Sequence, residues 1–138
     1  MKQISILLML LFLNCIGKKQ TEEIRVLNEN DCDSDFNIFF EKFQKDSAFQ
    51  IRHVKFPYMY YYSDEDFPLD MMESAVWKED FETIDFKSDT NSQFTINFIN
   101  KIDSVSCIKQ NKSKSIIEYK FVIINHCWFL VEVIDNTD

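Results

Sequence analysis

Residues 116–134 have the sequence IIEYKFVIINHCWFLVEVI, and this segment says most about the architecture of the protein. Two runs rich in β-branched and aromatic residues, 116–124 and 127–134, are typical of β-strands. Only Asn125 and His126 stand between them, and so short a connection favours a tight turn. The pattern therefore predicts an antiparallel hairpin of two long strands.

Both faces of this hairpin are predicted to be apolar. A two-residue turn would place Ile123 opposite Trp128 and Phe121 opposite Leu130. The residues expected on one face are Tyr119, Phe121, Ile123, Trp128 and Leu130. Those expected on the other face are Val122, Ile124, Cys127, Phe129, Val131 and Val133. One face would pack on the core. The other must be shielded from water by something else, and a second subunit in a homodimer formed through the sheet is one candidate.

An amphipathic helix is predicted ahead of the strands. Ser34 or Asp35 can cap its first turn, because a short oxygen-bearing side chain accepts hydrogen bonds from free backbone N–H groups. Four phenylalanines then recur at helical spacing and form one stripe: Phe36, Phe39, Phe40 and Phe43. The polar face of this helix is not rich in Lys and Arg, so the stripe should face the protein core rather than a membrane surface.

The middle of the chain gives weaker signals. Residues 49–56 alternate between apolar and polar and predict a strand closed by Pro57. Residues 69–77 fit a short helix and residues 77–86 a strand. Residues 94–102 alternate again and predict a further strand. A helix followed by a run of long antiparallel strands indicates the α+β class.

The first 15 residues resemble the signal sequence of a bacterial lipoprotein. Lys2 gives a positively charged start, residues 4–13 form a short apolar run, and Cys15 follows a polar break. This run is shorter than the roughly 20 apolar residues of a membrane-spanning helix and is typical of a cleaved export signal. In lipoproteins the cysteine sulfur carries a diacylglycerol. Phe12 and Asn14 depart from the usual pattern, and the alternatives are an ordinary secretory signal or a buried apolar helix.

The resemblance implies a signal peptide at 1–14 and a lipidated cysteine and tether at 15–30. The length and the element pattern of the rest indicate a single α+β domain at 31–138. The protein would be anchored in the bacterial cell envelope by its lipid, periplasmic or at the outer membrane, with the side of the membrane left open. The net charge of −8 at pH 7 argues against nucleic acid as a partner, because phosphates would repel the domain. Charge would not hold it on an anionic membrane either, so the lipid must do so.

Three cysteines remain for the domain: Cys32, Cys107 and Cys127. In an oxidising compartment this predicts one disulfide and one free thiol, and the sequence does not choose the pair. Three buried, unpaired thiols are the alternative. No two cysteines have metal-ligand spacing and the chain has only two histidines, so no metal is expected. The single glycine, Gly17, provides no phosphate-binding loop, and no cofactor is expected.

Parts of the domain resemble an uncharacterised family of Bacteroides-type lipoproteins. The likeness rests on residues 36–57, where Phe-Gln-Ile-Arg is followed by Phe-Pro, and continues in Trp77, 119–121 and 128–130. That family is similar to the nuclear-transport-factor-2-like superfamily, in which a curved antiparallel sheet wraps helices into a cone with a pocket. The resemblance implies an N-terminal helix or helices packed on such a sheet and a place in the envelope. It implies no activity.

Aromatic side chains are the candidate binding residues. The run at 58–62 carries rings with hydroxyl tips, which suit sugar stacking or a protein interface because they bury area and keep a polar group. The alternative is a strand that simply points Tyr60 and Tyr62 inward. The residues proposed for a pocket or binding surface are Tyr58, Tyr60, Tyr62, Trp77, Tyr119 and Trp128.

Three functions are open at this stage. The leading hypothesis is a non-enzymatic module that binds a protein or a small-molecule ligand. The second is an immunity or inhibitor lipoprotein against an envelope toxin, since an acidic surface steers a protein onto a basic partner. The third is a pocket enzyme of isomerase or dehydratase type, which needs a carboxylate base with a Tyr or His. His53 is of a suitable type, but no spacing identifies a catalytic residue.

Overall fold

The computed structural model describes residues 32–64, 66–86, 94–112 and 115–137. The predicted signal peptide, the cysteine predicted to carry lipid (Cys15) and the predicted tether lie outside these residues. The described elements are α1 (Phe36–Phe43), α2 (Ser47–Arg52), β1 (Val54–Asp64), β2 (Phe67–Val76), the 3-10 helix η2 (Lys78–Asp80), β3 (Phe94–Asn100), β4 (Ser104–Asn111), β5 (Ile116–Ile124) and β6 (Cys127–Asp135).

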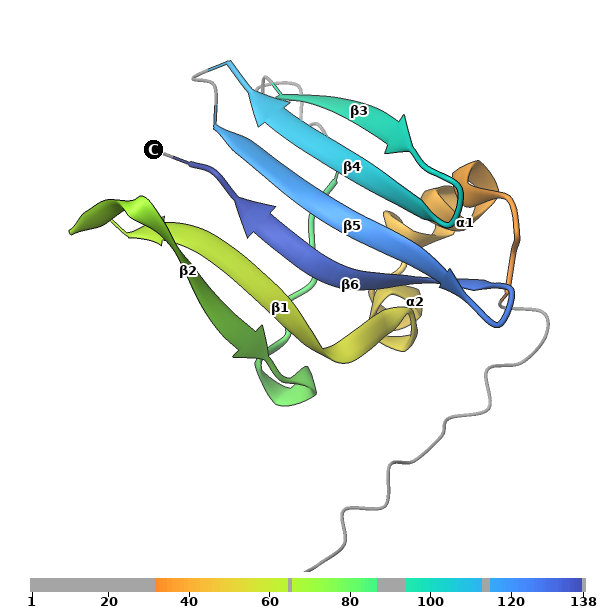
Figure 1. Ribbon diagram of the computed structural model, residues 1–138. Helices are drawn as coiled ribbons and strands as arrows, with labels where there is room; N and C mark the ends of the chain where they lie inside the picture. Colours follow the sequence, from red (N-terminus) through yellow and green to blue (C-terminus); the bar gives the residue numbers. More distant parts are fainter. Residues whose placement is uncertain (1–31, 65, 87–93, 113–114, 138) are drawn as a thin grey trace, which may run out of the picture.

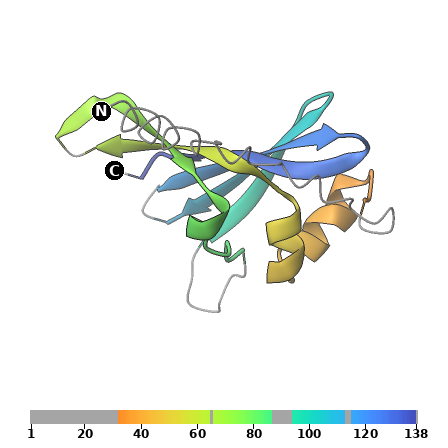
Figure 2. The same ribbon diagram turned by 90° about the horizontal axis from the view of Figure 1, so that it is seen from below.

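A curved six-stranded sheet forms one layer, and the two α-helices pack on one of its faces (Figures 1 and 2). The strand order is β2-β1-β6-β5-β4-β3. β6 lies between β1 and β5, parallel to the first and antiparallel to the second. The predicted α+β class is confirmed. The sheet is mixed rather than wholly antiparallel, because the last strand pairs with the first.

α1 is the predicted phenylalanine helix. Of the two candidate caps, Asp35 takes the role: its Oδ1 accepts from the backbone N–H groups of Asn37 at 2.8 Å and Ile38 at 3.4 Å. All four phenylalanines of the stripe are buried. α1 has eight residues, and neither it nor any other helix in the described part of the chain is long and apolar enough to traverse a bilayer.

α2 shows that the strand predicted for residues 49–56 is wrong in its first half. α1 ends at Phe43, and Asp46 caps a second helix, because its Oδ1 accepts from the N–H groups of Ala48 at 2.8 Å and Phe49 at 3.0 Å. The chain therefore completes another helical turn before β1 begins at Val54.

Gln50 explains why the alternating pattern misled. This side chain is 2 % exposed although it occupies a polar position of the pattern. Its amide nitrogen donates to the carbonyl oxygen of Ile84 at 2.8 Å, and its amide oxygen accepts from the Ile84 N–H at 2.9 Å. Both polar ends are thus satisfied inside the protein, and the segment that follows η2 is fastened to α2.

β1 continues through Pro57, where the predicted strand was expected to stop. The Phe56–Pro57 peptide bond is cis. Pairing with β6 skips from Val54 to Met59, and pairing with β2 starts only at Tyr58. Pro57 therefore lies at a place where neither neighbouring strand needs its missing N–H donor.

The predictions for residues 69–77 and 77–86 are both wrong. The segment 69–77, predicted as a short helix, belongs mostly to a strand that pairs antiparallel with β1. The segment 77–86, predicted as a strand, contains η2 followed by residues 81–86 without regular structure. Pairing with the long β1 outweighs the weak local preference of these residues.

The hairpin of β5 and β6 has the predicted turn and, near the turn, the predicted register. Asn125 and His126 have positive φ angles of 50° and 66°, which the tight two-residue turn requires. Ile123 lies opposite Trp128, as expected.

A bulge in β6 corrects the predicted position of one side chain. The register shifts so that Val131 has no partner between Leu130 and Glu132. Val133 consequently lies opposite Tyr119. It is only 4 % exposed and belongs to the core face, not to the opposite face.

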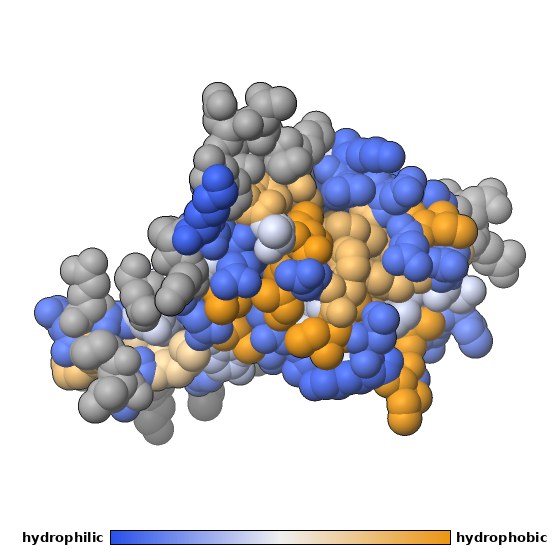
Figure 3. Space-filling model, turned by 90° about the horizontal axis from the view of Figure 1, so that it is seen from above, coloured by the Kyte–Doolittle hydropathy of each residue, from blue (hydrophilic) through white to orange (hydrophobic). Residues whose placement is uncertain are grey.

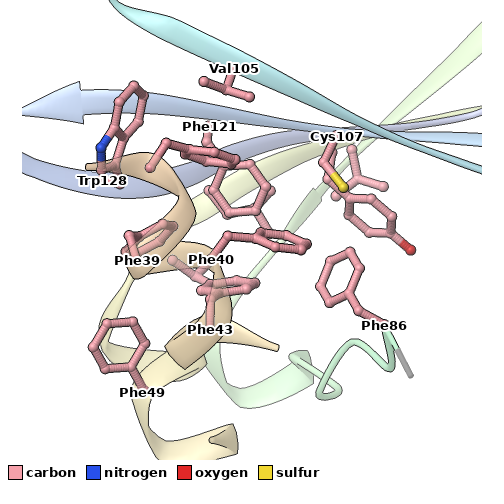
Figure 4. Close-up of a cluster of buried hydrophobic side chains, with 14 of the residues drawn as sticks. Phe39, Phe40, Phe43, Phe49, Phe86, Val105, Cys107, Phe121 and Trp128 are labelled. Atoms are coloured by element: carbon pink, nitrogen blue, oxygen red, sulfur yellow. The ribbon is translucent and has the colours of Figure 1, made fainter. Parts of the chain in front are cut away.

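The core is an aromatic cluster between α1 and the sheet (Figure 4). Phe121, at its centre, is fully buried, and its ring lies 5.1 to 6.1 Å from the four rings of the α1 stripe. Phe86 closes the cluster, with its ring 5.0 Å from that of Phe40 and 4.9 Å from that of Tyr119. Edge-to-face contacts of this kind add to the stability gained by burial.

The cysteines divide into one disulfide and one free thiol. Cys32 and Cys127 are bonded, with Cα atoms 4.6 Å apart, and join the start of the described chain to the first residue of β6. Cys107 is free and fully buried on β4. Burial raises the pKa of its thiol to about 12, so it stays protonated and packs as a small apolar group.

Apolar side chains remain at the surface in several places of the described chain. Val122, Ile124 and Phe129 are half-buried. They alternate along β5 and β6 with the core residues Phe121, Trp128 and Leu130 and therefore lie on the opposite face of the sheet. Along the β3 edge, Phe98 and Ile99 are 40 % and 53 % exposed. Seen from above, apolar surface is framed by hydrophilic side chains (Figure 3). The homodimer through the sheet stays a prediction.

Candidate functional site

Three tyrosines of β1 point to the face of the sheet on which the helices pack. Tyr58, Tyr60 and Tyr62 occupy alternate positions of the strand, so their side chains share one side. Tyr58, beside the core, is 8 % exposed, whereas the other two are half-buried. The rings of Tyr60 and Tyr62 stack with centroids 5.8 Å apart and 27° between their planes. The three side chains thus form a row that runs from the core toward the C-terminal end of β1.

Asp135, at the end of β6, meets this row. It lies opposite Tyr62 in the parallel ladder. Its Oδ2 accepts from the hydroxyl of Tyr60 at 2.7 Å, and its Oδ1 accepts from the backbone N–H of Thr137 at 3.0 Å. Burial, and after it the hydrogen bond to Asp135, raise the pKa of Tyr60 to about 12. Tyr60 is therefore a protonated donor at neutral pH.

An open pocket of about 440 Å³ lies over these groups. We call it the Tyr60 pocket, and its lining residues are Tyr60, Tyr62, Ser63, Ser74, Asp135 and Thr137. Its lining residues carry two aromatic rings, five hydroxyl groups and one carboxylate, and none of them is basic. This combination can stack on a flat or cationic group and accept hydrogen bonds from a polar one.

Two other tyrosines stand behind the pocket rather than in its lining. Tyr119 is 6 % exposed and packs on Phe86 in the core. Burial raises the pKa of Tyr119 and that of Tyr58, so both stay protonated. Tyr58 and Tyr119 therefore belong to the core next to the pocket and not to its lining.

The two tryptophans lie elsewhere. Trp77 follows the end of β2 and is 53 % exposed. Trp128 is in the core beside the hairpin turn, where its Nε1 donates to the carbonyl oxygen of Ser34 at 3.1 Å and its ring lies 5.2 Å from that of Phe36. The structure brings neither of them to the Tyr60 pocket.

His53 is part of the core. It caps the C-terminus of α2, is fully buried, and stacks on the ring of Phe49 at 3.9 Å. Its Nδ1 lies 3.0 Å from the carbonyl oxygen of Phe49. His53 therefore joins α2 to the sheet and does not line the Tyr60 pocket.

A second hollow, of about 490 Å³, lies on the outer side of the helices. Its charged residues are of both signs: Glu41, Lys42, Lys45, Asp46 and Arg52. Lys45 already pairs with Glu41 at 3.6 Å, both of them exposed. In the described ranges, no three His, Cys, Asp or Glu side chains lie close enough together to hold a metal ion. The Tyr60 pocket is therefore the better candidate site.

Comparison with known proteins bears on the fold. No protein-family model and no curated protein matches the sequence. Among solved structures, the chain is similar to a nuclear-transport-factor-2-like protein from Bacteroides fragilis, with 17 % sequence identity and a TM-score of 0.57 over 81 % of this chain and 50 % of that one. The chain thus spans half the length of that protein. A nuclear-transport-factor-2-like protein of unknown function from Shewanella baltica matches with 13 % identity and a TM-score of 0.43 over 71 % of this chain and 83 % of that one.

The Bacteroides match covers most of this chain. At this identity it carries information on architecture alone. The sequence resemblance implied helices packed on a curved antiparallel sheet; the helices and the curved sheet are confirmed, and the sheet is mixed and unclosed. The chain therefore has a nuclear-transport-factor-2-like fold of the α+β class.

Proposed function

We propose that this chain is a non-enzymatic binding module that takes a small polar molecule in the Tyr60 pocket. The observation that carries the proposal is the meeting of a tyrosine pair and a carboxylate in one open pocket. Aromatic faces give a ligand area to stack on, and the polar groups around them fix its orientation.

Unused hydrogen-bonding capacity in the pocket supports this proposal. A carboxylate has about four acceptor positions. Asp135 uses one toward the Tyr60 hydroxyl and one toward the Thr137 N–H. Ser63 and Ser74, on the two paired strands, also line the pocket. A ligand carrying N–H or O–H groups would meet acceptors that are already oriented.

The isomerase or dehydratase alternative receives less support from the same geometry. Such an enzyme needs a free donor for a developing oxyanion beside its carboxylate base. The Tyr60 hydroxyl already donates its hydrogen bond to Asp135 and is not free to donate to a substrate. His53 is fully buried in the core and does not line the pocket. The arrangement favours recognition over proton transfer.

The pocket is tested by filling it. Replacing Ser74 with Trp places a large ring in the pocket, whereas Ala75→Trp puts the same ring on the opposite, exposed face of β2 and serves as a matched control. Thermal-shift titrations would use glucose, N-acetylglucosamine, myo-inositol, choline and putrescine as probes. At least one probe should stabilise the unmodified protein and the Ala75→Trp variant but not the Ser74→Trp variant. If no probe binds, or if Ser74→Trp leaves binding unchanged, the pocket is not the site.

The cellular setting is a separate part of the proposal. It rests on the export signal and on Cys15 as the point of lipid attachment. Globomycin, which blocks cleavage of lipoprotein signals, should leave a larger precursor, and Cys15→Ala should release the protein from the membrane fraction. Unchanged size and unchanged fractionation would refute the lipid anchor and would leave the pocket proposal standing.

A further inference from the structure

We propose that the ligand of the Tyr60 pocket is an organic cation, with its ammonium group beside the Asp135 carboxylate and against the rings of Tyr60 and Tyr62. This inference rests on the proposed binding function and assigns the charge of the molecule bound. It follows from three observations on the charge, the aromatic groups and the surroundings of the pocket.

The first observation is a carboxylate without a compensating charge. Asp135 is half-buried, and its hydrogen-bond partners are the neutral Tyr60 hydroxyl and the Thr137 N–H. No Lys, Arg or His of the described residues forms an ion pair with it. By contrast Glu132, three positions earlier on β6, has Lys120 at 3.5 Å. A charge that is partly removed from water and left unpaired is unfavourable, and a bound cation would relieve this.

The second observation is the pair of aromatic faces. Tyr60 and Tyr62 both line the pocket, with their rings stacked side by side along β1. The face of a tyrosine ring attracts an ammonium group through its quadrupole, most strongly where water is partly excluded. A neutral polar ligand would gain from stacking but not from this charge–quadrupole attraction.

The third observation is the acidic field around the pocket. Residues 56–77, which contain β1 from Phe56 onward and all of β2, include no Lys, Arg or His. The acidic residues described on this hairpin are Asp64, Asp66, Asp70 and Glu73. With a net charge of −8 for the chain, the pocket lies in a region that concentrates cations and repels anions.

The chemistry of the lining favours an organic cation over a metal ion. Calcium takes six to eight oxygen ligands, commonly from several carboxylates, and magnesium requires a regular octahedron. The Tyr60 pocket offers a single carboxylate, and its remaining oxygens are hydroxyls. One diffuse positive charge on a group that can pack against the rings fits this lining better.

The test compares cations with a neutral molecule of the same shape. Isothermal titration calorimetry would measure choline, tetramethylammonium and putrescine against 3,3-dimethyl-1-butanol, the uncharged isostere of choline, at fixed ionic strength. We expect at least one of the cations to bind, and choline to bind about tenfold more tightly than the isostere, a difference in the range that one ammonium–aromatic and carboxylate contact provides. That preference should shrink as salt is added.

Variants identify the groups responsible. Asp135→Asn keeps an acceptor for the Tyr60 hydroxyl but removes the charge, and it should weaken cation binding about tenfold while leaving the isostere unaffected. Tyr62→Leu, which removes a ring without touching Asp135, should also weaken cation binding. Asp103→Asn, an exposed position at the β3–β4 turn, is the matched control and should change nothing. Unfolding midpoints of all variants would be compared to confirm that each one folds.

The outcomes separate this inference from the function on which it rests. If the isostere binds as tightly as choline, or if Asp135→Asn leaves cation affinity unchanged, the organic-cation inference is wrong. If all three cations fail but a saccharide binds and is excluded by Ser74→Trp, the inference is wrong and the binding module stands. If no cation and no saccharide binds, both are refuted.

Discussion

Breaking the Cys32–Cys127 disulfide is expected to lower the free energy of unfolding by several kcal/mol. The two cysteines are 95 positions apart, so the bond closes a loop that runs from α1 to the end of β5. In the chain-entropy account, a cross-link over a loop of this length stabilises a protein by about 4.7 kcal/mol at 25 °C, because it restricts the unfolded chain. The measured loss of stability should be somewhat smaller than this figure, since residual structure in the unfolded state reduces the effect of the cross-link.

The assay is urea unfolding followed by tryptophan fluorescence, with and without reductant. Trp128 is the residue after Cys127 and is buried, so it reports on the region that the disulfide fixes. For a slope of roughly 2 kcal/mol per M urea, reduction should lower the midpoint by about 2 M. The variant with Cys32→Ala and Cys127→Ala should behave like the reduced protein and should not respond to reductant. An identical midpoint for the oxidised and reduced protein would refute the reasoning.

Three further predictions concern the core, a helix cap and the alkaline limit of stability. Phe121→Ala should lower the free energy of unfolding by about 3–5 kcal/mol in the same urea assay, because the fully buried ring of Phe121 contacts all four rings of the α1 stripe. Phe67 is 59 % exposed, so the control variant Phe67→Ala should change the free energy of unfolding by less than about 0.5 kcal/mol. Asp46→Ala should destabilise by about 1 kcal/mol through loss of the α2 cap, measured by thermal unfolding, and an unchanged melting temperature would contradict the role of the cap. Because the pKa of Tyr60 is raised from 10.0 to about 12, its contribution to stability is complete below about pH 10 and is lost as the pH rises toward 12. Thermal unfolding across that window should show a smaller loss for Tyr60→Phe than for the unmodified protein, and equal losses would contradict the assignment.

The sequence predicted those elements whose signals are local. The α1 stripe repeats at helical spacing, and the Asn125-His126 turn sits between two unambiguous strands, so each could be placed from neighbouring residues alone. α2 was missed because Gln50 is buried by a partner 34 positions away. The bulge at Val131 has no sequence signature, and it moved Val133 to the other face.

The candidate site was predicted only in part, for a related reason. The aromatic run on β1 identified Tyr60 and Tyr62 as binding residues, because rings with polar tips are recognisable along the chain. Asp135 and Ser74 were not identified. They reach the pocket through the parallel pairing of β1 with β6 and the antiparallel pairing of β1 with β2, and the partner of a strand is not encoded within the strand itself.

The position of β6 has a consequence for how the protein is made. This strand joins the β1–β2 hairpin to the β3–β5 strands, so the two halves of the sheet share no backbone hydrogen bonds across the centre until residues 127–135 are present. Contacts between sequence-distant strands also form slowly. During synthesis, the sheet of the growing chain would therefore remain incomplete until β6 emerges. If the chain is exported as its first residues predict, this delay keeps it unfolded enough to pass through a translocation channel. The Cys32–Cys127 disulfide must form equally late, because Cys127 is the first residue of β6.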